Sequence, residues 1–172
     1  MGTQLEIERK FLVKFPISWE NLAELFDGLK DVKRISQTYL KPKGKDPSAR
    51  VRKTIEGLTG DTETVYHFNQ KEYIQPGVHE ETEHEINKSQ YEKYLKNSHP
   101  DKVTVEKTRF VFKYRDQTFE LDVFKGPLKG LVILEIELKN KNDKVELPSF
   151  LKIVKEVTGD KKYNNFELAS KR

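Results

Sequence analysis

The 172-residue chain contains no cysteine, so it can form neither a disulfide framework nor a thiolate metal site. It also has no stretch that approaches the ~20 consecutive apolar residues needed to span a bilayer. The N-terminus lacks the basic and then apolar layout of a signal peptide. These absences predict a soluble, cytoplasmic protein with no membrane partner, and the lack of thiols permits a reducing compartment.

Several common catalytic motifs are missing as well. No Gly-rich phosphate loop with a following Lys-Ser or Lys-Thr occurs, and no serine lies in a G-x-S-x-G turn, which argues against P-loop enzymes and serine hydrolases. The histidines are His67, His79, His84 and His99, and none shows zincin spacing. We expect most of them in loops or on the surface, so zinc chemistry is not favoured.

The composition favours a folded, charge-rich domain. Charged residues make up 35% of the chain and apolar residues another 35%. With 32 Lys and Arg against 28 Asp and Glu, the net charge of +4 is too small for a protein that coats nucleic acid. Disorder is not expected either, because 10 Phe, 7 Tyr and 1 Trp supply core material. The length predicts a single domain over residues 1–172.

Period-two alternation of apolar and polar residues predicts a mainly β protein. The expected strands are 4–13, 34–41, 48–55, 63–73, 79–87, 103–115, 117–125 and 131–139. Turn residues at 44–47 and 57–61, and the short link at 115–117, indicate antiparallel hairpins. Eight antiparallel strands can close into a barrel, which leaves no exposed sheet edge.

Three helices are expected between the strands, at 19–29, 89–96 and 150–157, and they would pack outside the sheet. The supporting signals are an apolar face on the first helix (Trp19, Leu22, Phe26, Leu29), a capping box on the second (Ser89, Glu92), and start and stop residues for the third (Pro148, Ser149, Gly159). The predicted class is therefore α+β, an eight-stranded antiparallel β-barrel with helices outside.

Charged side chains recur on one face of strand after strand. In the first strand, Glu6, Glu8 and Lys10 all point to the same side, because successive side chains alternate between the faces of a sheet. A single strand of this kind is ordinarily amphipathic, with solvent on its charged face. The same pattern returns in four further pairs: Arg50 with Arg52, Lys107 with Arg109, Glu83 with Glu85, and Glu135 with Glu137.

The last pair is the most informative. Residues 131–134 are all apolar and lead directly into Glu135 and Glu137, so the strand reads as buried on both faces and yet carries two carboxylates. A buried carboxylate must be neutralised, paired or bound to a metal, because burying it alone is costly. A ladder of cross-strand salt bridges could provide the partners and is one explanation.

A charged barrel interior is the other explanation. Arg and Lys side chains inside it would bind the oxygens of a polyphosphate through charge-assisted hydrogen bonds. Carboxylates in the same space would repel that ligand unless a divalent cation joined them, and Mg²⁺ binds carboxylates, waters and substrate phosphate together. The pattern therefore favours a metal–polyphosphate site.

The same residues resemble the CYTH, or triphosphate tunnel metalloenzyme, family. Glu6-Ile7-Glu8-Arg9-Lys10 is similar to the family's E-x-E-x-K signature and lies at the N-terminus, where the family carries it. Further similarity covers essentially the whole chain, at 50–52, 71, 83–86, 105–109, 120–124, 134–137 and 160–163. The resemblance implies an eight-stranded tunnel in which cations hold a triphosphate and carboxylates hold one or two metal ions.

The resemblance also implies a role for each matching residue. The phosphate-binding positions are Lys10, Arg50, Arg52, Lys71, Lys107, Arg109 and Lys162, although Lys161 is an alternative to Lys162. The metal positions are Glu6, Glu8, Asp122, Glu135 and Glu137, with Glu83 and Glu85 as supporting acids. Lys10, Glu6 and Glu8 are the expected catalytic residues, and the metal would be Mg²⁺ or Mn²⁺.

Activities within that family include inorganic triphosphatase, thiamine triphosphatase, an adenylate cyclase class and messenger-RNA capping triphosphatase. The compact form beginning E-I-E-R-K-F-L-V is most similar to the small bacterial members that cleave inorganic triphosphate. We therefore expect a metal-dependent hydrolase of tripolyphosphate that acts as a monomer or homodimer. A cyclase, a thiamine or nucleoside triphosphatase, and a non-catalytic polyphosphate-binding module are the alternatives.

Overall fold

The computed structural model describes residues 2–44, 49–57 and 60–171. Its strands are β1 (Thr3–Val13), β2 (Leu29–Tyr39), β3 (Ala49–Glu56), β4 (Glu63–Gln75), β5 (Val78–Ile86), β6 (Val105–Tyr114), β7 (Gln117–Phe124), β8 (Val132–Leu138) and β9 (Ile153–Glu156). Its helices are α1 (Trp19–Asp27), α2 (Lys88–Leu95) and α3 (Asn165–Leu168), with short 3₁₀ turns η1 (Gly126–Leu128) and η2 (Lys161–Tyr163). Within this described part, none of the helices has the length and apolar character needed to cross a membrane.

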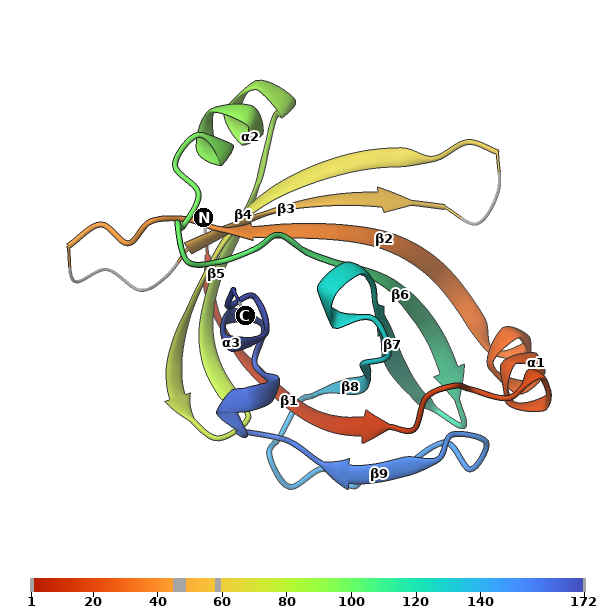
Figure 1. Cartoon of the computed structure of the whole chain (residues 1–172). Coiled ribbons are helices and arrows are strands. Elements are labelled where there is room, and N and C mark those ends of the chain that lie inside the picture. Colours follow the sequence, from red (N-terminus) through yellow and green to blue (C-terminus); the bar gives the residue numbers. More distant parts are fainter. Residues whose placement is uncertain (1, 45–48, 58–59, 172) are drawn as a thin grey trace.

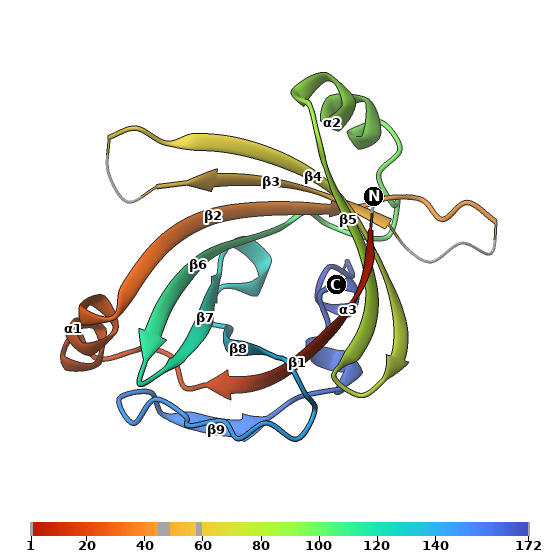
Figure 2. The same ribbon diagram turned by 180° about the vertical axis from the view of Figure 1, so that it is seen from behind.

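Eight of the strands form a closed antiparallel barrel, which confirms the predicted fold class. The sheet runs β5-β4-β3-β2-β6-β7-β8-β1, and a further β1–β5 pairing closes the ring. Figures 1 and 2 show the ring from opposite sides, with α1 and α2 outside it and α3 across one opening. In this order β3 lies four strands from β8, and β2 lies four strands from β1, so the members of each pair face each other across the barrel.

The apolar core surrounds the barrel instead of filling it. The largest apolar cluster contains Leu25 of α1, Phe112, Leu121 and Leu134 of the strands, and Phe150. A second cluster joins the C-terminal segment to one end of the barrel, and a third lies between α2 and strands β3–β5. Since these outward faces supply the hydrophobic stabilisation, the inward faces are free to carry charge.

The predicted third helix at 150–157 is wrong, because this segment contains strand β9, a ninth strand in the sheet. β9 pairs with Phe11–Val13 of β1, beyond the point where β5 stops pairing with that strand. Ile153 and Val154 are β-branched and favour a strand, and β1 offers them an unpaired edge. The apolar spacing of residues 150–157 fits a strand as well as a helix. The unpaired edge of β1 makes the segment a strand. Gly159 follows β9 in a turn with φ +73° instead of ending a helix.

The other two helices form, with corrections to their ends and faces. α1 ends at Asp27, so Leu29 belongs to β2; Trp19 is 86% exposed, and Leu25 is the residue that α1 buries. The capping box predicted at Ser89 and Glu92 is wrong, because Asn87 and Gln90 form it two residues earlier. Asn87 directly follows β5, so the end of the strand sets the start of α2.

The Pro76-Gly77 turn and Thr158 accept hydrogen bonds from the middle of β1, where neither β5 nor β9 pairs with that strand. The amide of Glu8 donates to the Gly77 carbonyl at 2.9 Å, and the amide of Lys10 donates to the Thr158 hydroxyl at 2.9 Å. Gly77 has φ +75°, and a Cβ there would lie 2.7 Å from the carbonyl oxygen of Glu8. A glycine is therefore required next to the charged segment of β1.

This close contact predicts that Gly77→Ala destabilises the protein more than a glycine substitution in open space. Gly126→Ala is the matched control, because Gly126 has φ +60° but nothing within 4 Å of its Cβ position. The control carries only the left-handed backbone penalty of about 1–2 kcal/mol. Thermal and urea unfolding should show a larger loss for Gly77→Ala, and equal losses would contradict the steric explanation.

Candidate active site

The barrel encloses a polar cavity of about 230 Å³, which continues into an outer cavity of about 630 Å³ under the C-terminal segment. Both cavities are lined by Glu8, Arg50, Lys71 and Asn165, so they form one continuous space. Ionisable side chains from β1, β3, β4, β5, β6, β7 and β8 line the inner cavity. The alternation that places apolar residues outside thus gathers the charged residues within.

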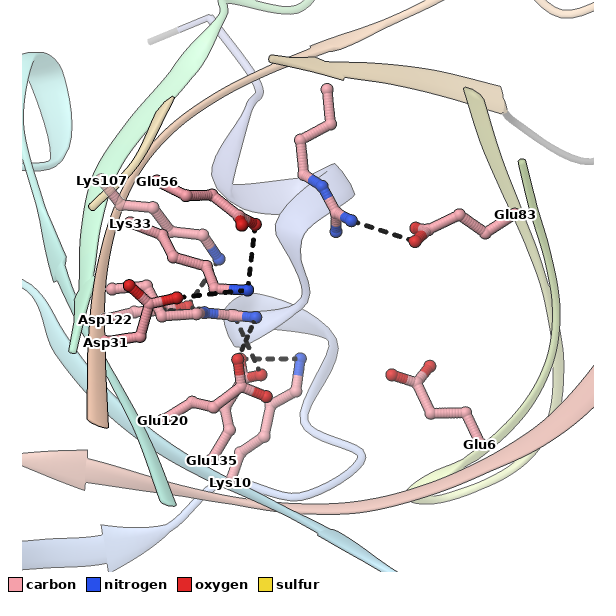
Figure 3. Close-up of polar contacts among 12 residues, drawn as sticks. Glu6, Lys10, Asp31, Lys33, Glu56, Glu83, Lys107, Glu120, Asp122 and Glu135 are labelled. Atoms are coloured by element: carbon pink, nitrogen blue, oxygen red, sulfur yellow. Dashed lines mark hydrogen bonds and ion pairs between the residues drawn. The ribbon is translucent and has the colours of Figure 1, made fainter. Parts of the chain in front are cut away.

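A buried cluster on β6 and β7 is the densest charged contact. Asp122, which is 0% exposed, accepts from Lys107 at 2.5 Å and from two nitrogens of Arg109 at 2.7 and 2.8 Å. Burial favours the neutral acid, but Arg109 and Lys107 outweigh it and hold the pKa of Asp122 well below its usual range. Arg109 also reaches Glu120 at 2.6 Å and Glu135 at 3.4 Å (Figure 3).

Lys10 links the two acidic strands. Its Nζ lies 3.3 Å from Glu8 on its own strand and 3.7 Å from Glu135, its cross-strand partner on β8. Burial alone would lower the pKa of Lys10, but Glu135 and Glu8 outweigh it and raise that pKa above its ordinary value. Lys10 therefore keeps its positive charge at neutral pH.

The opposite wall, on β3, β4 and β5, carries ion pairs that are more exposed than the Asp122 cluster. Arg52 donates to Glu83 at 3.1 Å, and Lys71 lies 2.5 Å from Glu6 and 4.0 Å from Glu81. Figure 3 shows Glu6 and Glu83 on the side of the barrel away from the Asp122 cluster. These partly exposed pairs are held less firmly than the buried cluster, so a ligand could replace them at lower cost.

Several buried donors have no hydrogen-bond partner within the described residues. Those that line the inner cavity are Nε2 of Gln37, Nε of Arg50 and Nε of Arg52. A buried donor without a partner costs about 1–3 kcal/mol. Three of them on the neighbouring strands β2 and β3 indicate a site for an anionic ligand.

The wall across from β3 has a complementary feature at Glu137 of β8. Glu135 is buried as expected, whereas Glu137 is exposed. The part of Glu137 that is shielded from water, followed by repulsion from Glu6, Glu120, Glu81 and Glu8, raises its pKa. The groups that act on this carboxylate are therefore other carboxylates, and it lines the inner cavity. A divalent cation would relieve this repulsion, since carboxylate oxygens are its preferred protein ligands.

A group of potential metal ligands lies at the β1–β5 junction. One ligand atom each from Glu6, Glu8 and His79 lie within 4.8 Å of one another. Burial and Lys71 lower the pKa of His79, which favours its neutral imidazole. These residues fit a cation, because carboxylate and imidazole groups are both metal ligands.

The predicted site residues fall into three groups in the structure. Most line the cavities: Glu6, Glu8, Lys10, Arg50, Arg52, Lys71, Glu83, Lys107, Arg109, Glu135 and Glu137. Asp122 lies behind them, fully buried between its two cations. Glu85 is exposed near the end of β5, and at the C-terminal segment Lys161 lines the outer cavity whereas Lys162 is not among its lining residues.

Sequence reasoning missed several inward residues. Glu120 lies two positions from Asp122 on β7, and Glu81 two positions from Glu83 on β5, so strand alternation could have found both. The prediction of loop or surface histidines is wrong for His67, His79 and His84, which lie partly buried on β4 and β5. Gln37 had no detectable signal, because its neighbours on β2 are not charged in the repeating pattern.

A second missed group surrounds Lys33 near the start of β2. Its Nζ lies 3.2 Å from Glu56 of β3 and 3.8 Å from Asp31, and Figure 3 shows these three side chains on the same side as the Asp122 cluster. Lys33 is the cross-strand partner of Arg109, so it extends the row of cations along the barrel wall. Lys33 lies one residue before the predicted strand 34–41, so the predicted alternation does not extend to it.

Comparisons with known proteins support the same architecture. The model of the CYTH domain family matches residues 4–163. A crystal structure of an inorganic triphosphatase is 32% identical, with a TM-score of 0.60, and the match covers 97% of this chain and 99% of that one. A plant protein from Hippeastrum, described as a putative adenylyl cyclase with a dominant triphosphatase activity, is 16% identical with a TM-score of 0.54 over 78% of this chain and 80% of its own, which shows a shared fold.

A curated relative, an inorganic triphosphatase from Acetivibrio thermocellus, is 43% identical over 68 residues. That match covers 40% of this chain and 42% of the relative. The residues that the family model matches include the inward charged residues of all eight barrel strands. The chain belongs to the CYTH domain family.

Proposed function

We propose that this protein hydrolyses inorganic triphosphate to pyrophosphate and phosphate with the help of a divalent metal ion. The observation that carries the proposal is the division of the cavity between unpartnered donors and mutually repelling carboxylates. Gln37, Arg50 and Arg52 offer donors on β2 and β3, and Glu137 lies across the barrel on β8. A phosphate chain fits the first wall and a cation the second.

The relatives support a triphosphate as the substrate. The crystal structure with almost complete coverage and the partial match from Acetivibrio thermocellus are both described as inorganic triphosphatases. The tunnel also offers cations along its length, from Lys33 and Arg109 to Lys71 and Lys10. A chain of three phosphates can contact more of them than pyrophosphate can, so length is the expected basis of selectivity.

Residues of this chain would position the reacting groups in the following way. Arg50 and Arg52 hold phosphate oxygens, and Gln37 adds a neutral donor beside them. The pKa of Lys10 is raised, so this residue supplies a positive charge to the phosphoryl group and does not act as a base. Glu120, whose pKa is raised, can accept the proton of the attacking water.

Glu6, Glu8 and Glu137 are the carboxylates that would hold the metal ion. When bound, Mg²⁺ or Mn²⁺ neutralises charge on the phosphoryl oxygens and lowers the pKa of a coordinated water. Asp122 takes a different part from the one expected of a metal ligand. Because both of its oxygens already accept from Lys107 or Arg109, it fixes these cations in place.

The first expected result is metal-dependent release of phosphate from tripolyphosphate. Activity should vanish in excess EDTA and return with Mg²⁺ or Mn²⁺, and pyrophosphate should react much more slowly because it leaves some cations unpaired. Phosphate release should be measured for tripolyphosphate, thiamine triphosphate and ATP in parallel. Full activity in EDTA would contradict the proposal, and formation of a cyclic product from ATP would favour the adenylate cyclase alternative.

Two substitutions should separate the metal wall from the phosphate wall. Glu137→Gln removes a carboxylate of the proposed metal site, so the metal concentration needed for half-maximal rate should rise and kcat should fall. Arg52→Ala removes a phosphate donor worth about 1.5–3 kcal/mol, so KM should rise about tenfold or more with little change in the metal requirement. Glu146→Gln is the control, because this carboxylate pairs with Arg115 at 2.8 Å outside the cavity. Identical effects of the first two substitutions would argue for a merely structural role.

The raised pKa of Glu137 also predicts an unusual pH dependence of stability. The folded protein holds this proton more tightly than the unfolded chain does, so stability falls as pH rises from the ordinary value of 4.5 through the raised pKa. Glu137→Gln removes that penalty. Metal-free Glu137→Gln should therefore melt at a higher temperature than wild type at pH 7–8, and the difference should close near pH 4.

The control for this experiment is a carboxylate whose pKa is lowered, so its substitution should change stability in the opposite direction. Arg115 lowers the pKa of Glu146, so Glu146→Gln should leave the melting temperature unchanged or lower it slightly at pH 7. Calorimetry in EDTA over a series of pH values measures both variants. A wild-type protein that is more stable than Glu137→Gln at pH 7–8 would show that this carboxylate has a stabilising partner.

A further inference from the structure

His79 is a cavity residue that the reaction described above does not use. It is the second residue of β5, and its direct cross-strand partner on β1 is Glu6. Directly opposed residues of an antiparallel pair place their side chains on the same face, with Cβ atoms about 4.5–5.5 Å apart. His79 therefore shares the inward face of β1 with Glu6, and it lines the outer cavity with Glu8 and Lys10.

The separation of its nitrogen from the carboxylates fits direct coordination. Ligand atoms of His79, Glu6 and Glu8 lie within 4.8 Å of one another. A metal with bonds of about 2.1 Å accepts ligands as far apart as about 4.2 Å across an octahedron, so small side-chain rotations bring all three into contact with one ion. Within the described residues, no other group of three or more His, Asp and Glu side chains has its ligand atoms within 4.8 Å of one another.

The imidazole is also available for a ligand. Nδ1 of His79 is buried and has no hydrogen-bond partner within the described part of the chain. The ring packs edge-on against Tyr73, with centroids 6.0 Å apart, which restrains its orientation without using a nitrogen. A metal ion would give a nitrogen of this ring the partner that it lacks.

The geometry points to His79 as a nitrogen ligand of the metal held by Glu6 and Glu8, and to a site that prefers Mn²⁺ or Co²⁺ over Mg²⁺. This inference rests on the proposed function, because it specifies the metal of the same site. Carboxylates suit Mg²⁺ and Mn²⁺ alike, whereas imidazole suits transition metals. One nitrogen among the ligands therefore shifts the selectivity away from Mg²⁺.

The test compares wild-type protein with His79→Ala and His84→Ala, all as full-length chains without a histidine tag. His84 lies on the same strand but on its other face, where its ring packs at a tilt against Phe68 with centroids 5.2 Å apart. Calorimetric titration with Mn²⁺, Co²⁺ and Mg²⁺ in the absence of substrate measures the selectivity. Pulsed electron paramagnetic resonance of bound Mn²⁺ measures coupling to an imidazole ¹⁴N.

Wild type and His84→Ala should show the nitrogen coupling, and His79→Ala should lose it. Loss of a direct ligand should weaken Mn²⁺ and Co²⁺ binding by at least the roughly 10-fold typical of losing an outer-sphere partner, with a much smaller change for Mg²⁺. Added imidazole should restore part of the lost Mn²⁺ affinity of His79→Ala, because the vacated space opens into the outer cavity.

The spectrum of wild-type protein decides the question even if His79→Ala does not fold. Bound Mn²⁺ without nitrogen coupling, or coupling that persists in His79→Ala, would overturn the assignment of His79. If hydrolysis of tripolyphosphate still required a metal in that case, the proposed function would stand. If no divalent ion bound wild type or activated it, the proposed function itself would fail and this inference with it.

Discussion

Asp122 and its two cations are the contact on which the rest of the barrel interior depends. The carboxylate has no exposed surface, and Lys107 and Arg109 hold both of its oxygens at 2.5 to 2.8 Å. Removing one member of a buried ion pair typically costs about 3–5 kcal/mol, because a charge is left without a partner. Arg109 also contacts Glu120 and Glu135, so it links the Asp122 cluster to these two carboxylates. A side chain that would otherwise be flexible is thus fixed where it can meet a ligand.

An interior of this kind is tolerable only because the hydrophobic core lies elsewhere. Phe112, Phe119 and Leu134 are fully buried on the outer faces of their strands, against α1 and the segment that precedes β9. In an ordinary small barrel the inward residues fill the interior. Here the outer layer supplies the apolar burial, which explains why a chain with only 35% apolar residues still folds.

The sequence contained enough information for the barrel and for most of the charged rows, because both rest on the period of two. Glu135 and Glu137 could be singled out since a run of apolar residues leads into them. The strand β9 could not be predicted, because its residues fit either a helix or a strand until the free edge of β1 is known. The part played by Asp122 was also hidden. Its residue type suits a metal ligand, and only the tertiary contacts show that both oxygens are already taken.

The two halves of the cavity differ in how completely their charges are paired, and this difference has a functional meaning. Around Asp122 the charges satisfy one another, so a ligand gains little by replacing those contacts. Around Glu137 the neighbouring groups are other carboxylates, and donors of Gln37 and Arg50 have no partner within the described residues. A ligand that supplies these missing partners stabilises the protein, because it binds the folded state and not the unfolded chain. Under the proposed function, the unpaired groups would bind substrate and metal, and the paired groups would hold the surrounding side chains in position.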